Sequence, residues 1–385
     1  MSSRATTGSA GVVIDGDVHN ALPDLDRFIP AVWAGGWRTA SVPTSHNYAN
    51  PRGGVARKDV TPPNGGAPAS DPYFLISDHL DPYGIDYAIL TGPHLIHLGT
   101  DLDYQNMMAR AMNECTAATW LTISDRFRGS ILVNLDDPHA AAREIRHWAS
   151  DKRFVQVIAA AATRRPIGQR EFWPIFEACS ETGLPLAVHP GTEGAGTAFP
   201  PTPMGWPSRY MEWHNILPIG YMAQINSLVT EGAFEHFPSL RFIAIEGGTA
   251  WLPHLMWRMN KNYKALRDTT PWLTRLPSEY ILDHVRLTTQ PIEEPRRPEE
   301  LTQILAMIEA ERTLMFSSDY PHWDYDNANL ILTAIDSSTR ARIMGETAAE
   351  LYGIIRMPLP EDLPAHLPAT DEPVEQPMTE AVPVE

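Results

Sequence analysis

Cysteine is nearly absent from this chain, whose 385 residues include only Cys115 and Cys179. Two cysteines cannot build a disulfide framework, and both lie in helix-like stretches, so we expect them to pack in a protein of a reducing compartment. No apolar run is long enough to span a bilayer. The N-terminus, MSSRATTGSAG, also lacks the apolar core of a secretory signal. These absences predict a cytoplasmic protein.

Positive charge is also scarce, because 30 lysines and arginines face 47 aspartates and glutamates, giving a net charge of −17. This balance argues against nucleic acid or an anionic membrane as a partner and leaves a small molecule as the expected substrate. The hydrophobic fraction of 43% is sufficient for a large core.

Short apolar runs alternate with longer helical patterns, which is typical of βαβ units and a parallel sheet. Helices are expected at 137–149, which opens with Asp and Pro, and at 169–183, which closes with Gly. Eight strands are expected, at 12–19, 84–92, 127–135, 154–161, 184–191, 240–248, 284–291 and 312–321.

Eight strands, each followed by a helix, predict an α/β fold of the (β/α)8 TIM-barrel type over residues 12–356. Residues 1–11 are expected to be a flexible N-terminus. Residues 20–77, rich in Pro, Gly, Ser and Asn, form a long insertion after the first strand, which we interpret as a lid or an interface element. The tail, 357–385, is rich in proline and acidic residues and has no aromatic residue, so we expect it to be disordered.

Polar residues stand at the C-terminal ends of several predicted strands, where a TIM barrel builds its active site. The first strand ends in Asp17-Val18-His19, and residues two apart in a strand share a face. His189 ends the fifth strand, Glu246 the sixth and Asp319 the eighth. Two histidines with carboxylates at one mouth suit zinc, manganese or iron better than calcium or copper(I).

Each of these residues also has a simpler explanation. An aspartate at a strand end is often a helix cap or a turn former, and a single histidine such as His19 is more often a hydrogen-bonded packing residue. The metal interpretation rests on the joint occurrence of four such residues at the mouth of one barrel, namely Asp17, His19, His189 and Asp319. A buried carboxylate such as Asp319 would otherwise be costly without a cation.

Four motifs make the chain resemble the amidohydrolase superfamily, in particular the branch that includes aminocarboxymuconate-semialdehyde decarboxylase and several aromatic-acid decarboxylases. The motifs are IDGDVH (14–19), LAVHPG (186–191), IEGG (245–248) and SSDYPHWD (317–324). Together they are specific for the superfamily, whereas none is specific alone. The resemblance runs from about Val12 to Leu351.

The resemblance implies one divalent metal ion, with zinc as the expected ion and manganese as the alternative. Its ligands would be Asp17, His19, His189 and Asp319. Members of the superfamily with two metals carry a carboxylated lysine at the end of the fourth strand. Because this chain has alanines at 159–161, we do not expect a second metal.

Glu246 departs from the family pattern, in which many members place a catalytic histidine at the end of the sixth strand. A carboxylate at this position could act as a general base or hold a metal-bound water. It could equally be a residue that hydrogen-bonds to a ligand histidine.

Three functions fit these residues. The first and preferred one is a metal-dependent hydrolase acting on an amide-like or lactone-like bond, with Asp319 accepting a proton from the metal-bound water and Glu246 assisting. The alternative is a non-oxidative decarboxylase of an aromatic or enoic acid, in which Asp319 or a nearby histidine protonates the carbon. The third is a binding protein without catalysis. The complete set of metal ligands argues against it, because a protein of that kind would not need them.

Substrate-binding residues are expected in the loops around the mouth. Each has a simpler explanation as a loop anchor, an exposed residue or a subunit contact. The candidates are Arg209, His214, Trp206, Trp213, His94 and His322. By analogy with the family we also expect a homodimer or a larger homo-oligomer.

Overall fold

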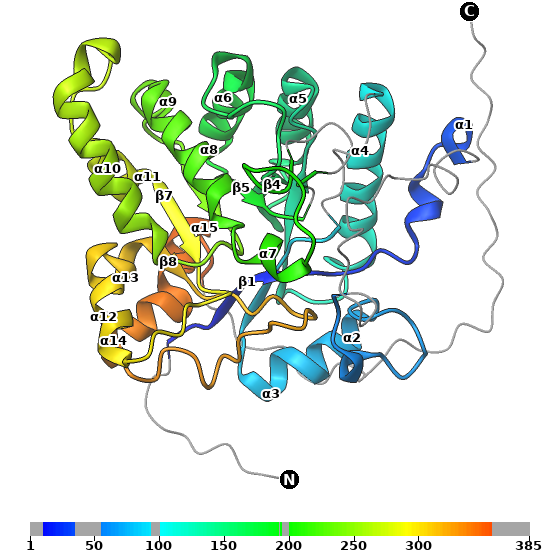
Figure 1. Ribbon diagram of the computed structural model, residues 1–385. Helices are drawn as coiled ribbons and strands as arrows, with labels where there is room; N and C mark the ends of the chain where they lie inside the picture. The colour runs from blue at the N-terminus through cyan, green and yellow to red at the C-terminus, as the bar shows by residue number, and fades with distance from the viewer. Residues whose placement is uncertain (1–10, 35–54, 94–100, 192, 195–199, 356–385) are drawn as a thin grey trace, which may run out of the picture.

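Eight parallel strands form one sheet in sequence order, surrounded by helices (Figure 1). The structure is a computed structural model that describes residues 11–34, 55–93, 101–191, 193–194 and 200–355. The strands are β1 Ile14–Val18, β2 Tyr87–Leu90, β3 Phe127–Leu132, β4 Phe154–Ala160, β5 Leu186–His189, β6 Phe242–Ala244, β7 Val285–Thr288 and β8 Leu314–Met315. The predicted (β/α)8 barrel and all eight predicted strands are confirmed.

The strands are mostly apolar and almost wholly buried because both of their faces are covered. All seven residues of β4 are buried, for example, which is the pattern of a parallel sheet with helices outside and a packed interior. Each strand is shorter than its predicted run, and several of the predicted residues at both ends lie in the connecting segments.

Helices follow the strands on the outside of the barrel. The longer ones are α4 Leu102–Thr119, α5 Pro138–Trp148, α6 Trp173–Thr182, α8 Pro218–Thr230, α10 Trp251–Leu266, α11 Pro277–His284 and α12 Pro298–Met307. The shorter ones are α1 Ala31–Ala34, α2 Pro72–Leu75, α3 Asp81–Tyr83, α7 Tyr210–His214, α9 Ala233–His236, α13 Ala310–Thr313, α14 Ser337–Ala341 and α15 Thr347–Tyr352.

Both predicted helices are present, and their ends have the expected chemistry. The Asp137 side chain accepts the Ala140 N–H at the start of α5, as an N-cap does. The second predicted helix begins with a 3₁₀ turn and continues as α6, which ends at Gly183 in a left-handed conformation with φ of 74°. Glycine reaches this conformation without a steric penalty.

Backbone hydrogen bonds close the barrel between β1 and the segment that follows β8. Gly16 N–H donates to the Phe316 carbonyl at 2.8 Å, and His19 N–H donates to the Tyr320 carbonyl at 2.8 Å. A Cβ at Gly16 would lie 3.0 Å from the Phe316 oxygen, so glycine permits the close approach. Closure therefore brings the end of β1 directly against the residues around Asp319.

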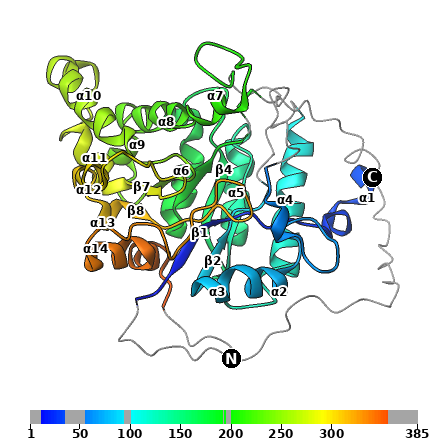
Figure 2. The ribbon, with the colours of Figure 1, turned by 60° about the horizontal axis from the view of Figure 1, so that its bottom comes forward.

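The segment between β1 and β2 is described in part, and it reaches the mouth of the barrel. Arg57 N–H donates to the Pro321 carbonyl at 2.8 Å, and Ala56 pairs with His322. Figure 2 shows α2 and α3, which follow, on the same side of the barrel as β1 and β2. The role of 20–77 as a lid or an interface stays a prediction, and the tail at 357–385 lies outside the described residues.

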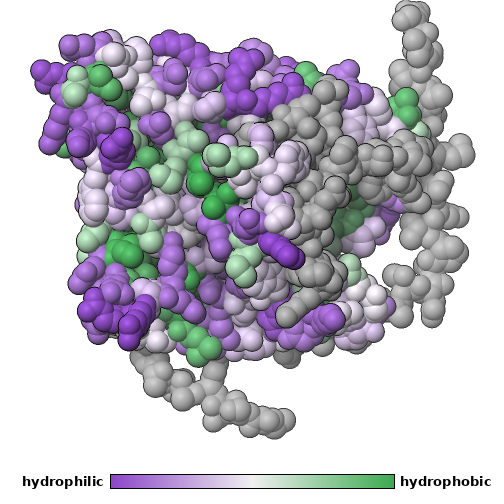
Figure 3. Space-filling view, in the orientation of Figure 1, coloured by the Kyte–Doolittle hydropathy of each residue, from purple (hydrophilic) through white to green (hydrophobic). Residues whose placement is uncertain are grey.

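The surface shown in Figure 3 is mainly hydrophilic, as the high content of acidic residues predicts, and the two cysteines are buried, as expected. This face has only small hydrophobic patches. Cys115 and Cys179 are both buried, and burial raises the pKa of their thiols to about 11 and about 12. In the part of the chain that the structure describes, no helix is long and apolar enough to cross a membrane.

His284, at the end of α11, couples stability to pH. Burial lowers the pKa of His284 to about 4, and Arg241 and Arg275 add to this although the bond to the Leu240 carbonyl opposes it. The unfolded chain therefore binds more protons than the folded one as the pH falls from about 6.5 towards 4, and stability is lost in that window.

We expect His284→Gln to flatten the pH dependence of the unfolding free energy between pH 7 and 5. Denaturant unfolding measures this, and an unchanged slope beside a His236→Gln control would contradict it.

Candidate metal centre

The four predicted metal ligands come together at the mouth of the barrel, and Glu246 joins them. Ligand atoms of Asp17, His19, His189, Glu246 and Asp319 all lie within 4.8 Å of one another. The side chains of Asp17 and Asp319 are fully buried, whereas that of His19 is 11% exposed. The elements that hold them are the ends of β1, β5, β6 and β8.

The separations within this group fit ligands around one divalent ion. His19 Nε2 lies 3.0 Å from Asp319 Oδ1, and His189 Nε2 lies 3.2 Å from Asp17 Oδ2. Ligands that sit about 2.0–2.2 Å from an ion stand roughly 3.0–3.5 Å from each other. Asp319 Oδ2 is buried and has no hydrogen-bond donor among the described residues, so it is directed at space that a cation would fill.

Glu246 and Asp319 share an uncommon backbone conformation. Their φ angles are 59° and 62°, in the left-handed region that residues other than glycine seldom adopt. Such strain persists where the surrounding structure enforces it, often at functional sites. Each turn follows the end of a buried strand and directs a carboxylate into the mouth.

Opposite charges stabilise the ionised carboxylate at the base of the site. Burial alone would raise the pKa of Asp17, but His19 and His189 lower it well below its usual range. Burial likewise opposes a charge on His189, whereas Asp17 and Glu246 raise its pKa well above the usual value. In the chain without metal, the histidine protons supply the positive charge that an ion would supply when bound.

Asp319 behaves differently, because burial raises the pKa of its carboxyl well above the usual range. His322 opposes this shift, while Glu246 and Asp17 add to it. His322 Nδ1 lies 2.7 Å from Asp319 Oδ1, within hydrogen-bonding distance. His322 is also 20% exposed, which connects this pair to the pocket.

A second group lies beside the first and contains Glu246 as well. His214 Nε2 is 3.1 Å from Asp324 Oδ2 and 3.7 Å from Glu246 Oε1. Burial would lower the pKa of His214, but Asp324 and Glu246 raise it to about 10. The buried amide of Gln290 donates to Asp324 Oδ2 at 2.8 Å and fixes that carboxylate.

A cavity of about 460 Å³ opens onto these groups, a size in the range of small-molecule sites. Its wall is aromatic on one side, with Tyr210 and Trp213 from α7 facing Trp323. In Figure 1, α7 lies in front of the central strands. None of the described residues that line this cavity is a lysine or an arginine.

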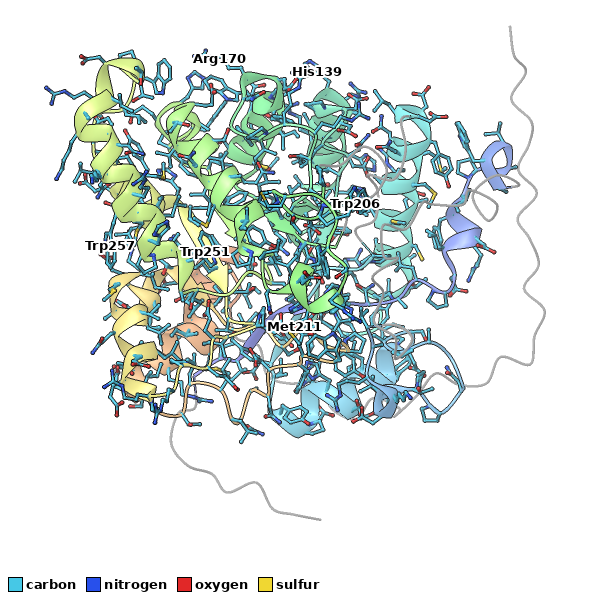
Figure 4. The ribbon with its side chains drawn as sticks, in the orientation of Figure 1. His139, Arg170, Trp206, Met211, Trp251 and Trp257 are labelled. Carbon is cyan, nitrogen blue, oxygen red and sulfur yellow. The ribbon has the colours of Figure 1, made fainter. Side chains whose placement is uncertain are left out.

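The structure divides the predicted substrate-binding residues. His322 and Trp213 line the cavity, and His214 lies beside it through its contacts with Glu246 and Asp324. Arg209 is exposed at the start of α7 and is not among the lining residues, and Trp206 is 63% exposed. Figure 4 labels Trp206, which precedes α7, and Met211, which lies on α7. His94 lies outside the described residues.

Sequence reasoning missed a buried network behind β1. His79 Nε2 lies 2.7 Å from Asp15 Oδ2, and Ser318 donates to both oxygens of Asp15 through its N–H at 2.8 Å and its hydroxyl at 2.5 Å. His79 also stacks on Tyr320 with ring centroids 4.5 Å apart. These contacts flank Asp319 on both sides and hold it in place. Asp15 belongs to the first motif and Ser318 to the last, but no sequence signal pairs either with His79.

A comparison with known families decides the family of this fold, because the profile described as Amidohydrolase matches residues 14–354. The chain belongs to the amidohydrolase family. The resemblance drawn from the four motifs is thereby confirmed, and the protein is an amidohydrolase-superfamily enzyme.

Curated relatives and solved structures add detail. The chain is 24% identical over 295 residues to the gamma-resorcylate decarboxylase of a Polaromonas species, covering 72% of this chain and 86% of the relative. It is 25% identical to the gamma-resorcylate decarboxylase of Rhodococcus jostii, with 65% of this chain and 77% of the relative covered. The fold resembles 5-carboxyvanillate decarboxylase from Novosphingobium aromaticivorans, solved with manganese, with a TM-score of 0.68, 22% identity and coverage of 91% and 98%.

These findings correct the preferred function drawn from the sequence. The relatives that match are decarboxylases, so the prediction of an amide or lactone hydrolase is wrong. The error arose because the ligand residues serve both reactions, so the four motifs do not by themselves favour the decarboxylase. The expected zinc is also not specifically supported, since the related structure contains manganese.

Metal binding can be checked directly with His189→Ala and Asp17→Asn. Each change removes a ligand atom from the group, so we expect the bound metal to fall from near-stoichiometric to a small fraction. Elemental mass spectrometry after desalting measures this. His236→Ala, an exposed histidine before β6, is the matched control and should retain its metal. Full metal content in both ligand variants would contradict the assignment.

His79→Phe tests the network behind β1. Phenylalanine keeps the stacking on Tyr320 but removes the partner of the buried Asp15 carboxylate. The loss of a hydrogen bond to a charged group costs about 2 kcal/mol. We expect the free energy of unfolding to fall by that amount and the metal affinity to weaken, as it does when outer partners of metal sites are lost. Calorimetry and metal titration measure the two effects, and a variant as stable as the parent would contradict the role.

Proposed function

We propose that this protein is a metal-dependent, non-oxidative decarboxylase of an aromatic acid. The observation that carries the proposal is the arrangement of the mouth, where a metal-ligand group forms the floor of a pocket with an aromatic wall. The pocket suits a flat ring with a carboxylate directed at the floor. The relatives support the same reaction class, since they decarboxylate gamma-resorcylate.

Asp17, His19, His189 and Asp319 would hold the ion, for which we propose manganese because a related structure contains it. When bound, a divalent ion supplies positive charge that polarises and orients oxygen atoms of the substrate. An aromatic acid with an oxygen substituent next to its carboxylate offers two such oxygens. The substrate class is therefore an ortho-hydroxylated aromatic acid.

Asp319 is the proposed proton donor. Its carboxyl is fully buried and lies 2.7 Å from His322 Nδ1. The proton passes from the Asp319 carboxyl to the ring carbon that bears the carboxylate. The bond from that carbon to the carboxylate then breaks and releases carbon dioxide, and its electron pair restores the aromatic ring. His322, partly exposed, returns a proton to Asp319, so one proton is consumed for each turnover.

The aromatic wall of the pocket has two tasks in this scheme. Tyr210, Trp213 and Trp323 orient the ring by contact with its faces and edges. They also exclude water from the ring carbon, which strengthens the electrostatic interactions at the floor. A homodimer or a larger oligomer stays a prediction, and the exposed Met204, Trp206 and Met211 are the apolar residues where we would look for its interface.

A substrate panel tests the proposed reaction. We expect the manganese-loaded protein to release carbon dioxide from 2,6-dihydroxybenzoate or 5-carboxyvanillate. We do not expect release from benzoate, which has no hydroxyl group next to its carboxylate. In D₂O the product should carry deuterium at the carbon that lost the carboxylate. Asp319→Asn should lower kcat by about 10²–10⁴-fold, the range for loss of a general acid. Product chromatography with mass spectrometry measures both effects.

The same assay can contradict the proposal. If the manganese-loaded protein releases no carbon dioxide from any ortho-hydroxylated acid in the panel, the reaction class is wrong. If Asp319→Asn still binds manganese and keeps the parent rate, the proton donor is wrong. The His236→Ala control should match the parent in both measurements.

A further inference from the structure

The carboxylate of Glu246 points its two oxygens in different directions. Oε2 lies 3.1 Å from His189 Nε2, within the first ligand group, and Oε1 lies 3.7 Å from His214 Nε2, within the second. A carboxylate that faces two ligand groups in this way is placed to bridge two ions. Metal pairs bridged in this way are commonly about 3.5–4 Å apart.

The second group offers a complete set of side-chain donors from three elements. Ligand atoms of His214, Glu246 and Asp324 lie within 4.8 Å of one another. They come from α7, from the turn after β6 and from the segment after β8. Imidazole combined with carboxylates suits manganese or zinc. Glu246 and Asp324 line the cavity, so an ion can enter from solvent.

Asp324 has the outer support that ligand carboxylates have. The buried Gln290 donates its amide to Asp324 Oδ2 at 2.8 Å and also contacts the Asp324 carbonyl at 3.3 Å. Partners of this kind fix the orientation of a ligand and are a regular feature of metal sites. His214 is held by ring contacts to Tyr210 and Trp323, with centroids 5.7 Å and 5.4 Å away.

The charges of the second group also suit a cation. In the second group two carboxylates, of Glu246 and Asp324, face one imidazole, of His214. Among the described residues that line the cavity there is no lysine or arginine, so a cation bound there would meet no like charge from these side chains. A proton on His214 and a metal ion compete for the same two carboxylates.

We infer that His214, Glu246 and Asp324 form a second divalent-metal site, with Glu246 bridging it to the first. The site lies between α7, the turn after β6 and the segment after β8. It would add a second ion to the single one that the family resemblance implies. A second cation would also bind the anionic substrate at the pocket floor. This last use rests on the proposed decarboxylase function, whereas the presence of the site does not.

Manganese titration of the metal-free protein tests the inference. We expect about two Mn²⁺ per chain at saturation by elemental mass spectrometry, with an exchange-coupled electron paramagnetic resonance signal from the bridged pair. Asp324→Asn and His214→Gln should each lower this to about one Mn²⁺ with an uncoupled six-line signal. Both substitutions keep a polar side chain of similar size, and circular dichroism checks that each variant is folded.

Matched controls remove the same groups elsewhere. His236→Ala and Asp268→Asn, both exposed and outside the site, should retain two coupled ions. Saturation of the parent at one uncoupled ion would overturn the second site but leave the first intact. Two ions retained in both site variants would overturn the assignment of His214 and Asp324. Binding of no manganese would overturn both sites, whereas loss of decarboxylation with two bound ions would overturn only the proposed reaction.

Discussion

Hydrogen bonding between β1 and the segment after β8 closes the barrel, and the arrangement of the site depends on it. Asp17 and His19 end the first strand, and Asp319 follows the last, so these residues are as distant in sequence as the barrel allows. The bonds from Gly16 to Phe316 and from His19 to Tyr320 bring them into one group. Because these are backbone bonds, they fix the positions of the strand ends whatever ion is bound. The side chains then need to supply only the chemistry.

Two turns with strained backbone face the site that this closure assembles. Glu246 and Asp319 both adopt left-handed conformations that cost a residue with a Cβ roughly 1–3 kcal/mol. The turn at Asp319 is held from behind, since Asp15 receives two hydrogen bonds from Ser318 and one contact from His79. A carboxylate held in this way cannot relax away from its neighbours when it loses a proton or an ion. The network therefore supplies rigidity where the buried charge would otherwise drive the side chains apart.

Much of the fold and part of the site could be predicted from the sequence. The eight strands are mostly apolar runs, and the local preference of these runs for a strand agrees with their place in the folded barrel. The barrel follows from their number and spacing. The ligand group could be predicted because strand ends converge in a barrel, which requires no knowledge of loops. Contacts that depend on loops could not be predicted. His214 meets Asp324 only through the path of the segment before α7, and His79 reaches Asp15 from a helix whose position no periodicity fixes. Arg209 has suitable chemistry for an acidic substrate, but its place at the start of α7 turns it towards solvent.

The choice between hydrolysis and decarboxylation lies in the rim of the pocket and not in the ligand set. A hydrolase must admit water next to the scissile bond and accommodate a leaving group on the far side. A decarboxylase must keep water away from one ring carbon and present an acid to it. Here the proposed acid, Asp319, is fully buried, and the aromatic residues Tyr210, Trp213 and Trp323 line the pocket that leads to it. The rim thus favours a flat substrate that displaces water. For such a substrate, the charge of a bound ion would act on oxygen atoms of the substrate.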